Sequence, residues 1–345
     1  MKTTKRAITD FASYLQRFFT EYLPGERMVS KHTVRAYRDT FVLFVEFMHS
    51  TQKISPDKIK LQNFTRDMVV SFLNWLIEVK HCSTSTYTSR YAAIRSFCEY
   101  LQYKEPSNLA QWQDIRAIKT KRPIRNSVEY LTMSGIKVLL EQIPTDNKVG
   151  RRDLAILSLL YESAARVQEL VNLTPSSLRL ESPAIVQLYG KGNKRRIVPL
   201  NPHVADLLSV YMKDYGIDTD YCRERPLFFN CWGTKLTTSG ITYILQKYAN
   251  LARIRHPTDI PPKISPHCLR HSKAMHLLEN GVNLIYIRDI LGHTSIQTTE
   301  IYARIDSKHK REAIEKASIR ISPLDLEKPI WEKDEQLKSF LKSLA

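Results

Sequence analysis

The sequence lacks several patterns that would assign it to a common class of protein. Its five cysteines form no CxxC pair, which disfavours both a disulfide framework and a structural zinc site. No apolar run approaches the roughly 18 residues of a membrane span, and the first residues, MKTTKRAITDF, contain no apolar segment of a signal peptide. It also has no GxxxxGKS/T phosphate loop, internal repeat or low-complexity tract. We therefore expect a folded cytoplasmic protein that uses no metal, no cofactor and no membrane.

Acidic residues are few relative to basic ones. The 345 residues include 52 lysines and arginines against 35 aspartates and glutamates, which gives a net charge of +17 and a pI near 9.6. Such an excess favours a polyanionic partner. No basic amphipathic helix with a bulky apolar face dominates the sequence, so a nucleic acid is preferred over a membrane surface. The length allows two domains, and the 43% hydrophobic content allows packed cores.

Residues 1–118 have the pattern of an almost wholly helical domain. Apolar residues recur with helical period in four segments, at about 8–23, 31–50, 66–79 and 85–103, and four such helices can bury one common core. Two of the helices begin with polar and basic residues, a composition that suits contacts to nucleic-acid phosphates. The candidate contacts here are Lys31, Arg35, Thr86 and Arg90. Capped, solvated helix ends would give the same pattern.

A basic segment at residues 119–130, KTKRPIRNSVEY, reads as an extended linker because it contains proline and has no periodicity. Its charge would let Lys121 and Arg122 lie along a phosphate backbone. Residues 131–321 then indicate a mixed domain, mostly helical with a small antiparallel sheet. Helices are expected at about 132–142, 151–172, 203–214 and 238–252. Strands are expected at 184–190 and 195–201, joined by a basic hairpin tip.

The stretch from residue 265 to 304 has the densest set of chemically useful side chains. Ser265 followed by proline predicts a helix start, so His267 and Arg270 share one face near N–H groups that favour an anion. Glycines at 281 and 292 predict the ends of this helix and of a second one that begins at about Asn283. His293 follows the second stop directly.

A third, short helix is expected to carry Tyr302. Thr294 and Gln297 have the spacing of a capping box that would open it. One phosphate-sized site could then contain His267, Arg270, His293 and Tyr302. Each residue taken singly is weak evidence, because an HxxR pair is often a solvated helix face and the chain has 17 tyrosines.

Four separate motifs together resemble the tyrosine recombinase, or phage integrase, family. They are SAARVQEL with Arg166, GKGNKRRIVPL with Lys191, HCLRH with His267 and Arg270, and LGH with His293, followed nine residues later by Tyr302. The resemblance implies an N-terminal core-binding domain, a catalytic domain, double-stranded DNA as partner and a homo-tetramer assembled on it. Whether a partner recombinase or accessory proteins take part is left open. The basic residues after the catalytic lysine, Lys194 and Arg195, are further candidate DNA contacts.

The resemblance also implies a role for each residue. Tyr302 would attack a DNA phosphodiester and leave a 3′-phosphotyrosyl link and a free 5′-hydroxyl. Arg166 and Arg270 would hold the non-bridging oxygens, which suits two planar, always charged guanidiniums. Lys191 would protonate the leaving oxygen, His267 would assist proton transfer, and His293 would support the phosphate.

Some positions depart from the family pattern. Ser163-Ala164-Ala165 stands where the family usually has a Thr-Gly-Leu-like turn, and Lys273 and His276 replace less charged residues. We expect Glu169 to orient the helix or an arginine rather than to act as an acid. Residues 322–345 predict a tail with a short amphipathic helix, whose apolar face, Leu337, Phe340, Leu341 and Leu344, would pack on its own domain or on a neighbouring copy.

The combined prediction is a site-specific DNA recombinase that exchanges strands through a four-way junction and serves a mobile element. The alternatives are a chromosome-dimer resolving recombinase, a type IB topoisomerase-like enzyme that relaxes DNA, and a non-enzymatic DNA-binding regulator. The intact set of catalytic motifs disfavours the last alternative, and the expected N-terminal DNA-binding domain disfavours the topoisomerase.

Overall fold

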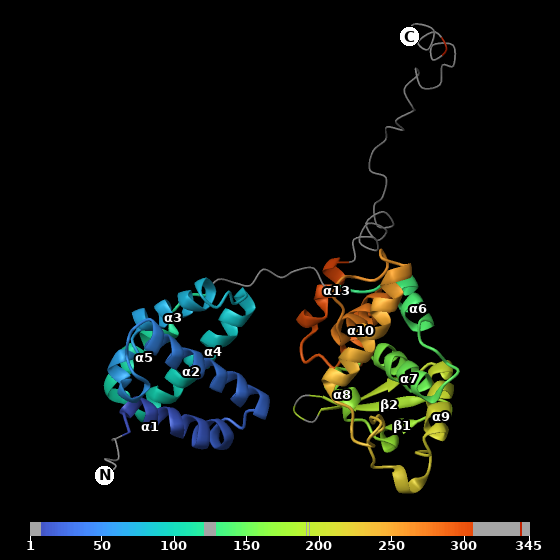
Figure 1. The fold of residues 1–345 in the computed structure, drawn as a ribbon, viewed down its shortest axis with the longest axis horizontal. Helices are drawn as coiled ribbons and strands as arrows, with labels where there is room; N and C mark the ends of the chain where they lie inside the picture. The colour runs from blue at the N-terminus through green and yellow to red at the C-terminus, as the bar shows by residue number, and fades with distance from the viewer. Residues whose placement is uncertain (1–7, 121–128, 191, 193, 306–338, 340–345) are drawn as a thin grey trace, which may run out of the picture. The chain divides into compact units, whose positions relative to one another are not determined.

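The computed structural model describes residues 8–120, 129–190, 192, 194–305 and 339. The chain divides into two compact units, residues 1–126 and residues 127–345, and each has its own hydrophobic core. Both units are mainly helical, and the second also contains a small antiparallel sheet (Figure 1). The predicted fold class is therefore confirmed. None of the described helices is both long and apolar enough to cross a membrane.

The first unit packs its helices around an aromatic core. Threonine or serine stands immediately before α1 to α4, and its side-chain oxygen accepts a backbone N–H of the first turn in each case. Phe97 lies at the centre, with ring contacts to Phe11, Phe18 and Phe41 at 5.1–5.9 Å between centroids. The helices are α1 Asp10–Arg17 with a π-helical continuation at Phe18–Glu26, α2 Lys31–Ser50, α3 Arg66–Glu78, α4 Thr84–Lys104 and α5 Leu109–Arg116.

Helix α5 is an addition to the four helices that the sequence pattern predicted. It has eight residues, too few for a clear helical period, and only Trp112 and Ile115 are buried. Its place is fixed by tertiary contacts: the indole of Trp112 donates to the Glu105 carbonyl at 3.0 Å, and the hydroxyl of Tyr91 donates to the Ile115 carbonyl at 2.9 Å.

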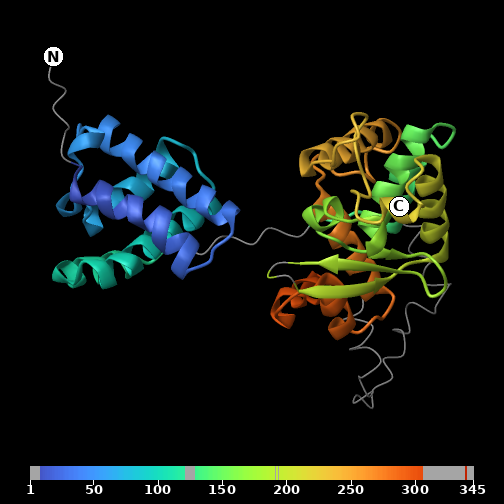
Figure 2. The ribbon, with the colours of Figure 1, turned by 90° about the horizontal axis from the view of Figure 1, so that it is seen from below.

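The second unit contains a three-stranded sheet with helices around it. The strands β1 Leu178–Arg179, β2 Ile185–Tyr189 and β3 Arg195–Pro199 are antiparallel in the order β1-β2-β3, and Gln187 is paired with Ile197. In Figure 2 the orange and red helices that follow residue 280 lie along one side of the strands, and α12 packs on β3. The helices are α6 Met133–Glu141, α7 Lys148–Glu162, α8 Val167–Val171, α9 Pro202–Asp214, α10 Thr238–Arg255, α11 Pro266–Glu279, α12 Leu284–Leu291 and α13 Glu300–Ile305.

Short 3-10 turns connect helices and strands in both units. They lie at Pro56–Lys58, Leu61–Asn63, Pro106–Asn108, Pro175–Ser177, Asp220–Cys222 and Ile296–Thr298. The sequence pattern missed the two-residue strand β1, which is too short to show alternation.

The expected helix over residues 151–172 is wrong, because the chain breaks between α7 and α8. Ala164 lies in the left-handed region with φ 47°. Ser163 supports the break, since its hydroxyl donates to the Leu159 carbonyl at 2.6 Å and accepts the Ala165 N–H at 3.3 Å. All these residues tolerate a helix, so the helical pattern gave no sign of an end, although the family pattern usually has a turn at these three positions.

The helix signals after residue 265 are mostly confirmed. Gly281 and Gly292 have φ of 77° and 62° and end α11 and α12, and the Asn283 side chain accepts the Ile285 N–H at 2.9 Å. The capping box at Thr294 is wrong. Ser295 instead accepts the Gln297 N–H, and α13 starts only after an intervening 3-10 turn. The expected tail at 322–345, apart from residue 339, lies outside the described residues.

Candidate active site

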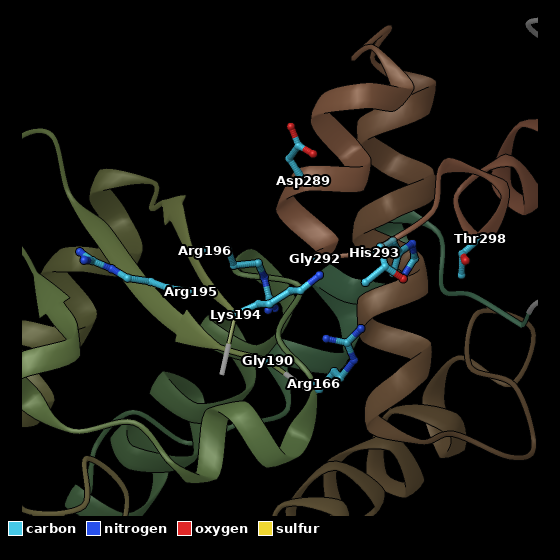
Figure 3. Close-up of a pocket in the computed structure, with 10 residues that line it drawn as sticks. Arg166, Gly190, Lys194, Arg195, Arg196, Asp289, Gly292, His293 and Thr298 are labelled. Carbon is cyan, nitrogen blue, oxygen red and sulfur yellow. The ribbon is translucent and has the colours of Figure 1, made fainter. Parts of the chain in front are cut away.

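Two cavities in the second unit share part of their lining, and together they form the candidate site. The smaller, of about 190 Å³, is lined by Arg166, His267, Arg270, His271, His293, Thr298, Ile301 and Tyr302. The larger, of about 470 Å³, shares Arg166, His293 and Thr298 and adds Gly190, Lys194, Arg195, Arg196, Asp289, Gly292 and Thr294 (Figure 3).

Five of the six predicted catalytic residues line the smaller cavity. The sixth, Lys191, lies outside the described residues, but its neighbours Gly190 and Lys194 both line the larger cavity. Residues separated by more than 130 positions in the sequence thus meet around one space. Helices α12 and α13 pack on α11, and Ala164 in the turn before α8 belongs to the same apolar cluster, which creates this arrangement.

Arg166 stands at the start of α8 and is held by a buried carboxylate. Glu169, 6% exposed, accepts the Arg166 backbone N–H and its Nη1, each at 2.8 Å. Arg196 of β3 also donates to this carboxylate, through Nη2 at 2.6 Å and Nη1 at 3.0 Å. Burial alone would raise the pKa of Glu169, but the hydrogen bonds from Arg196 and Arg166 lower it below its ordinary value. These contacts agree with the orienting role expected of Glu169.

Arg196 is a site residue that the sequence reasoning missed. Besides Glu169, it contacts α12, because its Nε donates to the Ile290 carbonyl at 2.8 Å. A Cβ atom at position 292 would lie 3.0 Å from Cδ of Arg196, so Gly292 leaves room for the Arg196 side chain. The same glycine also adopts the left-handed conformation that ends α12. The available signal was the basic run after Lys191, in which alternate residues of a strand face opposite sides.

Arg270 is 3% exposed and is anchored by two backbone carbonyls. Its Nη1 donates to Ala164 and its Nη2 donates to Leu291, both at 2.6 Å. Burial, with Arg166 and Arg196 nearby, lowers the pKa of the guanidinium to about 10, so it is still a cation at neutral pH. The left-handed turn at Ala164 presents the carbonyl to Arg270, so an alanine here adopts a conformation that more often requires glycine.

Two histidines border the same cavity as neutral side chains. Burial and the charges of Arg270 and Arg166 lower the pKa of His267 below its ordinary value and that of His293 to about 4. The Nδ1 of His293 lies 2.9 Å from the hydroxyl of Thr299, which is fully buried and fixes the ring. Both imidazoles can therefore receive a proton when an anion enters.

Tyr302 is 3% exposed, and its hydroxyl lies 2.8 Å from Nδ1 of His271. Burial raises the pKa of the phenol above its ordinary value, against a smaller opposing effect of Arg270. Burial, followed by His267 and Arg270, lowers the pKa of His271 to about 4. His271 was not predicted as a site residue. Its signal was a spacing of four from His267, which places both on one face of α11.

The predicted DNA contacts fall into separate places. Lys194 and Arg195 line the larger cavity, where Arg195 points away from Arg166 and His293 (Figure 3). In the first unit, Lys31 and Arg35 are exposed on α2.

The other contacts predicted in the first unit lie on α4. Thr86 lies in the first turn, where its N–H donates to Ser83, and Arg90 bridges to α2 by donating to the Ala36 carbonyl at 2.9 Å. Lys121 and Arg122 lie outside the described residues.

The arrangement is suited to binding and attacking an anion. Two guanidiniums and three imidazoles surround a space that also contains one phenol, and the Glu169 carboxylate beside it is occupied by Arg166 and Arg196. Among the described residues no group of three histidine, cysteine, aspartate or glutamate side chains is placed to hold a metal ion.

Comparison with protein families gives two matches that follow the two units. The model of the phage integrase family matches residues 129–309, and the model of the phage integrase N-terminal SAM-like domain matches residues 15–105. Among curated proteins, the putative integrase/recombinase y4rC of Sinorhizobium fredii is 31% identical over 99% of this chain and 100% of its own length. Tyrosine recombinase XerC of Thermodesulfovibrio yellowstonii is 30% identical over 92% of this chain and 97% of its own.

Solved structures share the fold. The XerH site-specific recombinase in a post-cleavage complex with its palindromic difH substrate aligns with a TM-score of 0.65 at 23% identity, over 82% of this chain and 79% of that one. The Tn1549 transposon integrase in complex with a circular intermediate DNA aligns with a TM-score of 0.67 at 16% identity, over 90% and 100%. From the family matches and the full-length relatives, the chain belongs to the phage integrase family and is a tyrosine recombinase, an enzyme that transfers DNA strands.

Proposed function

We propose that this protein cleaves and rejoins double-stranded DNA at specific sites through a 3′-phosphotyrosyl link on Tyr302. The observation that carries the proposal is the 190 Å³ cavity, which brings this tyrosine together with Arg166, Arg270 and three histidines. Its size suits one phosphodiester group, and its lining is cationic. A phosphate held there would have both guanidiniums and the attacking hydroxyl within reach.

Each part of the site supports one part of the chemistry. Arg166 and Arg270 bind the non-bridging oxygens and stabilise the charge that accumulates on them during phosphoryl transfer. Both are held by groups other than the substrate, a carboxylate and two carbonyls, so they are already oriented before DNA binds. His267 and His293 donate to the phosphate once its charge favours their protonation.

Lys191 is proposed as the acid that protonates the leaving 5′-oxygen. In the sequence it follows Gly190 and precedes Lys194, and these two neighbours line the larger cavity. Because the phosphotyrosyl ester retains the energy of the broken bond, the 5′-hydroxyl can attack it and restore the strand without ATP.

The DNA is proposed to contact both units. In this proposal residues 1–118 form the core-binding domain, residues 119–130 the linker and residues 131–321 the catalytic domain. The exposed basic residues Lys31 and Arg35 of the core-binding domain and Lys194 of the catalytic domain would contact the DNA. A homo-tetramer on DNA would exchange strands in sequence through a four-way junction. We assign the activity to a mobile element, in line with the putative integrase/recombinase that matches the whole chain. Chromosome-dimer resolution is the alternative.

Covalent trapping tests the proposal. The full-length protein is incubated with nicked duplexes from the ends of its encoding locus, so that a short cleaved strand diffuses away and the adduct accumulates. Wild type should form an adduct, and Tyr302→Phe should form none while it binds the same DNA with similar affinity. An adduct with Tyr302→Phe, or none with wild type on any duplex, would contradict the proposal. A mapped site at the boundary of an element supports the mobile-element role, whereas one chromosomal site supports dimer resolution.

The role of Lys191 has a separate test on the same DNA. Lys191→Ala should slow cleavage strongly when oxygen is the bridging 5′ atom and far less when sulfur replaces it, because a thiolate leaves without protonation. An equal defect on both substrates would remove the acid role from Lys191.

A further inference from the structure

We propose that His271, rather than His267, takes the proton from Tyr302 when DNA is cleaved and returns it when the strand is rejoined. The inference rests on the proposed function and adds a seventh residue to its catalytic set. His271 qualifies as catalytic because it contacts the reacting oxygen itself.

The geometry singles out His271 among the histidines of the cavity. Its Nδ1 lies 2.8 Å from the Tyr302 hydroxyl, and the two ring centroids are 5.8 Å apart. His293 uses its own Nδ1 for Thr299. The His267 ring is 6.3 Å from the His271 ring, on the same face of α11 but one turn nearer the helix start. The position that faces the phenol therefore belongs to His271.

The surroundings of His271 keep its imidazole neutral in the absence of DNA. The titratable groups that line the same cavity are Arg270 and His267 on α11, Arg166 at the start of α8, His293 after α12, and Tyr302 on α13. Burial, followed by His267 and Arg270, lowers the pKa of His271 and favours the neutral form. The raised pKa of the phenol keeps Tyr302 protonated. In this proposal His271 has the Nε2–H tautomer, in which the unprotonated Nδ1 accepts the hydrogen bond from the phenol 2.8 Å away.

Tyr302 Oη forms a bond to phosphorus, the bond from phosphorus to the 5′-oxygen breaks, and the phenolic proton moves to Nδ1 of His271. The leaving oxygen takes its proton from the acid assigned to Lys191. An entering phosphodiester brings a negative charge beside Arg166 and Arg270, which raises the proton affinity of His271 before the transfer. Rejoining reverses each transfer.

A pair of matched variants separates proton transfer from simple positioning. In His271→Asn, the amide oxygen can stand near the position of Nδ1 and accept the hydrogen bond, but it cannot take the proton. His276→Asn is the control on the same helix. His276 is also 3% exposed, and its Nδ1 lies 2.9 Å from the hydroxyl of Tyr161, yet neither of these two residues lines the cavity.

The assay measures single-turnover cleavage on the duplex mapped by covalent trapping, with oxygen or sulfur as the bridging 5′ atom. We expect His271→Asn to cleave about 10²-fold slower or worse, the usual contribution of a general base, and His276→Asn to stay within about twofold of wild type. Sulfur should not restore His271→Asn, because its defect lies on the attacking side. Its rate should keep rising with pH up to the phenol pKa, whereas the wild-type rate levels off.

Cleavage by His271→Asn within about threefold of wild type, or faster, would overturn the assignment, and so would rescue by sulfur. Wild type without any adduct would instead mean that the proposed function has failed. Nitrogen NMR of histidine in the DNA-free protein provides a measurement that needs no His271 variant. Tyr302→Phe should shift the signal of the unprotonated Nδ1 of His271, because the hydrogen bond to the phenol is lost. A shift confined to His267 would also overturn the assignment of His271.

Discussion

The two units differ in what they bury. The fully buried residues of the first unit are apolar and largely aromatic, apart from Thr40 and Ser96. The second unit buries Asp153, Glu169, Arg270 and His276, with several hydroxyls. A buried charge costs free energy unless it is paired. In the second unit Arg270 lines the smaller cavity and Glu169 holds Arg166 beside it, so part of this cost falls on the candidate site. The described residues of the first unit bury no charged side chain and pack aromatic rings instead.

Among variants that keep the Tyr302 hydroxyl, the largest expected effect is that of Arg270→Lys. An ammonium cannot donate to the carbonyls of Ala164 and Leu291 and to a phosphate in the geometry of a guanidinium. Cleavage should fall by about 10³-fold or more, which is the usual contribution of an arginine in phosphoryl transfer. Lys273→Arg is the control, since Lys273 lies on the same helix and pairs with Glu162 at 2.9 Å. It should retain wild-type cleavage, and comparable losses in both variants would contradict this reading.

Glu169→Gln should affect both stability and activity. It leaves Arg166 and Arg196 without their shared carboxylate, and breaking a buried ion pair costs about 3–5 kcal/mol. Asp153→Asn is the matched change, because Asp153 is equally buried and pairs with Arg152 and Tyr248.

Calorimetry of the full chain should show the transition of the second unit lowered in both variants. Only Glu169→Gln should also slow cleavage at a temperature where both variants are folded. If Asp153→Asn slows it as much, loss of stability rather than arginine orientation explains the effect.

Acidification should distinguish the units in the wild-type protein. The pKa values of His271 and His293 are about 4 in the folded chain, against an ordinary value near 6.5. Between these values the unfolded chain binds more protons, so the stability of the second unit should fall as pH decreases from about 6.5 to 4.

The histidines of the first unit, at 32, 49 and 81, are exposed, so its transition should move less over this range. Calorimetry at intervals of half a pH unit measures both transitions. Equal shifts of the two transitions would contradict the assigned cause.

The smallest expected effect is that of Ala164→Gly. Glycine relieves the left-handed strain, about 1–2 kcal/mol, but it loses a buried methyl group and gains freedom in the unfolded chain. These terms oppose each other, so stability should change by less than about 1 kcal/mol and cleavage should be retained. Ala164→Val should be clearly destabilising, because a β-branched residue tolerates this conformation poorly. If Ala164→Val were more stable than Ala164→Gly, the left-handed conformation of residue 164 would be contradicted.

Most helices and strands could be predicted from the sequence, because local signals determine where they begin and end. Helix-capping residues, helical apolar stripes and glycine stops mark helix ends without reference to the rest of the chain, as at Asn283, Gly281 and Gly292. The prediction failed where distant contacts decide. The break after α7 depends on Arg270 using the Ala164 carbonyl, and α5 depends on where Trp112 packs.

The same division holds for the site. Motif spacing brought five residues together correctly around one cavity, but it could not identify Arg196 or His271. Their relevance comes from contacts across 27 and 31 positions, to Glu169 and to Tyr302. The basic run and the spacing of four from His267 are local signals for the two residues, but neither signal predicts which distant group each one contacts.

The most direct test of the central claim is to identify the residue that becomes linked to DNA. The trapped adduct is digested with trypsin and nuclease, and the modified peptide is sequenced by mass spectrometry. We predict a nucleotide attached through a 3′-phosphate to Tyr302, in the peptide that ends at Arg304. Attachment to another residue, or through a 5′-phosphate, would contradict the account.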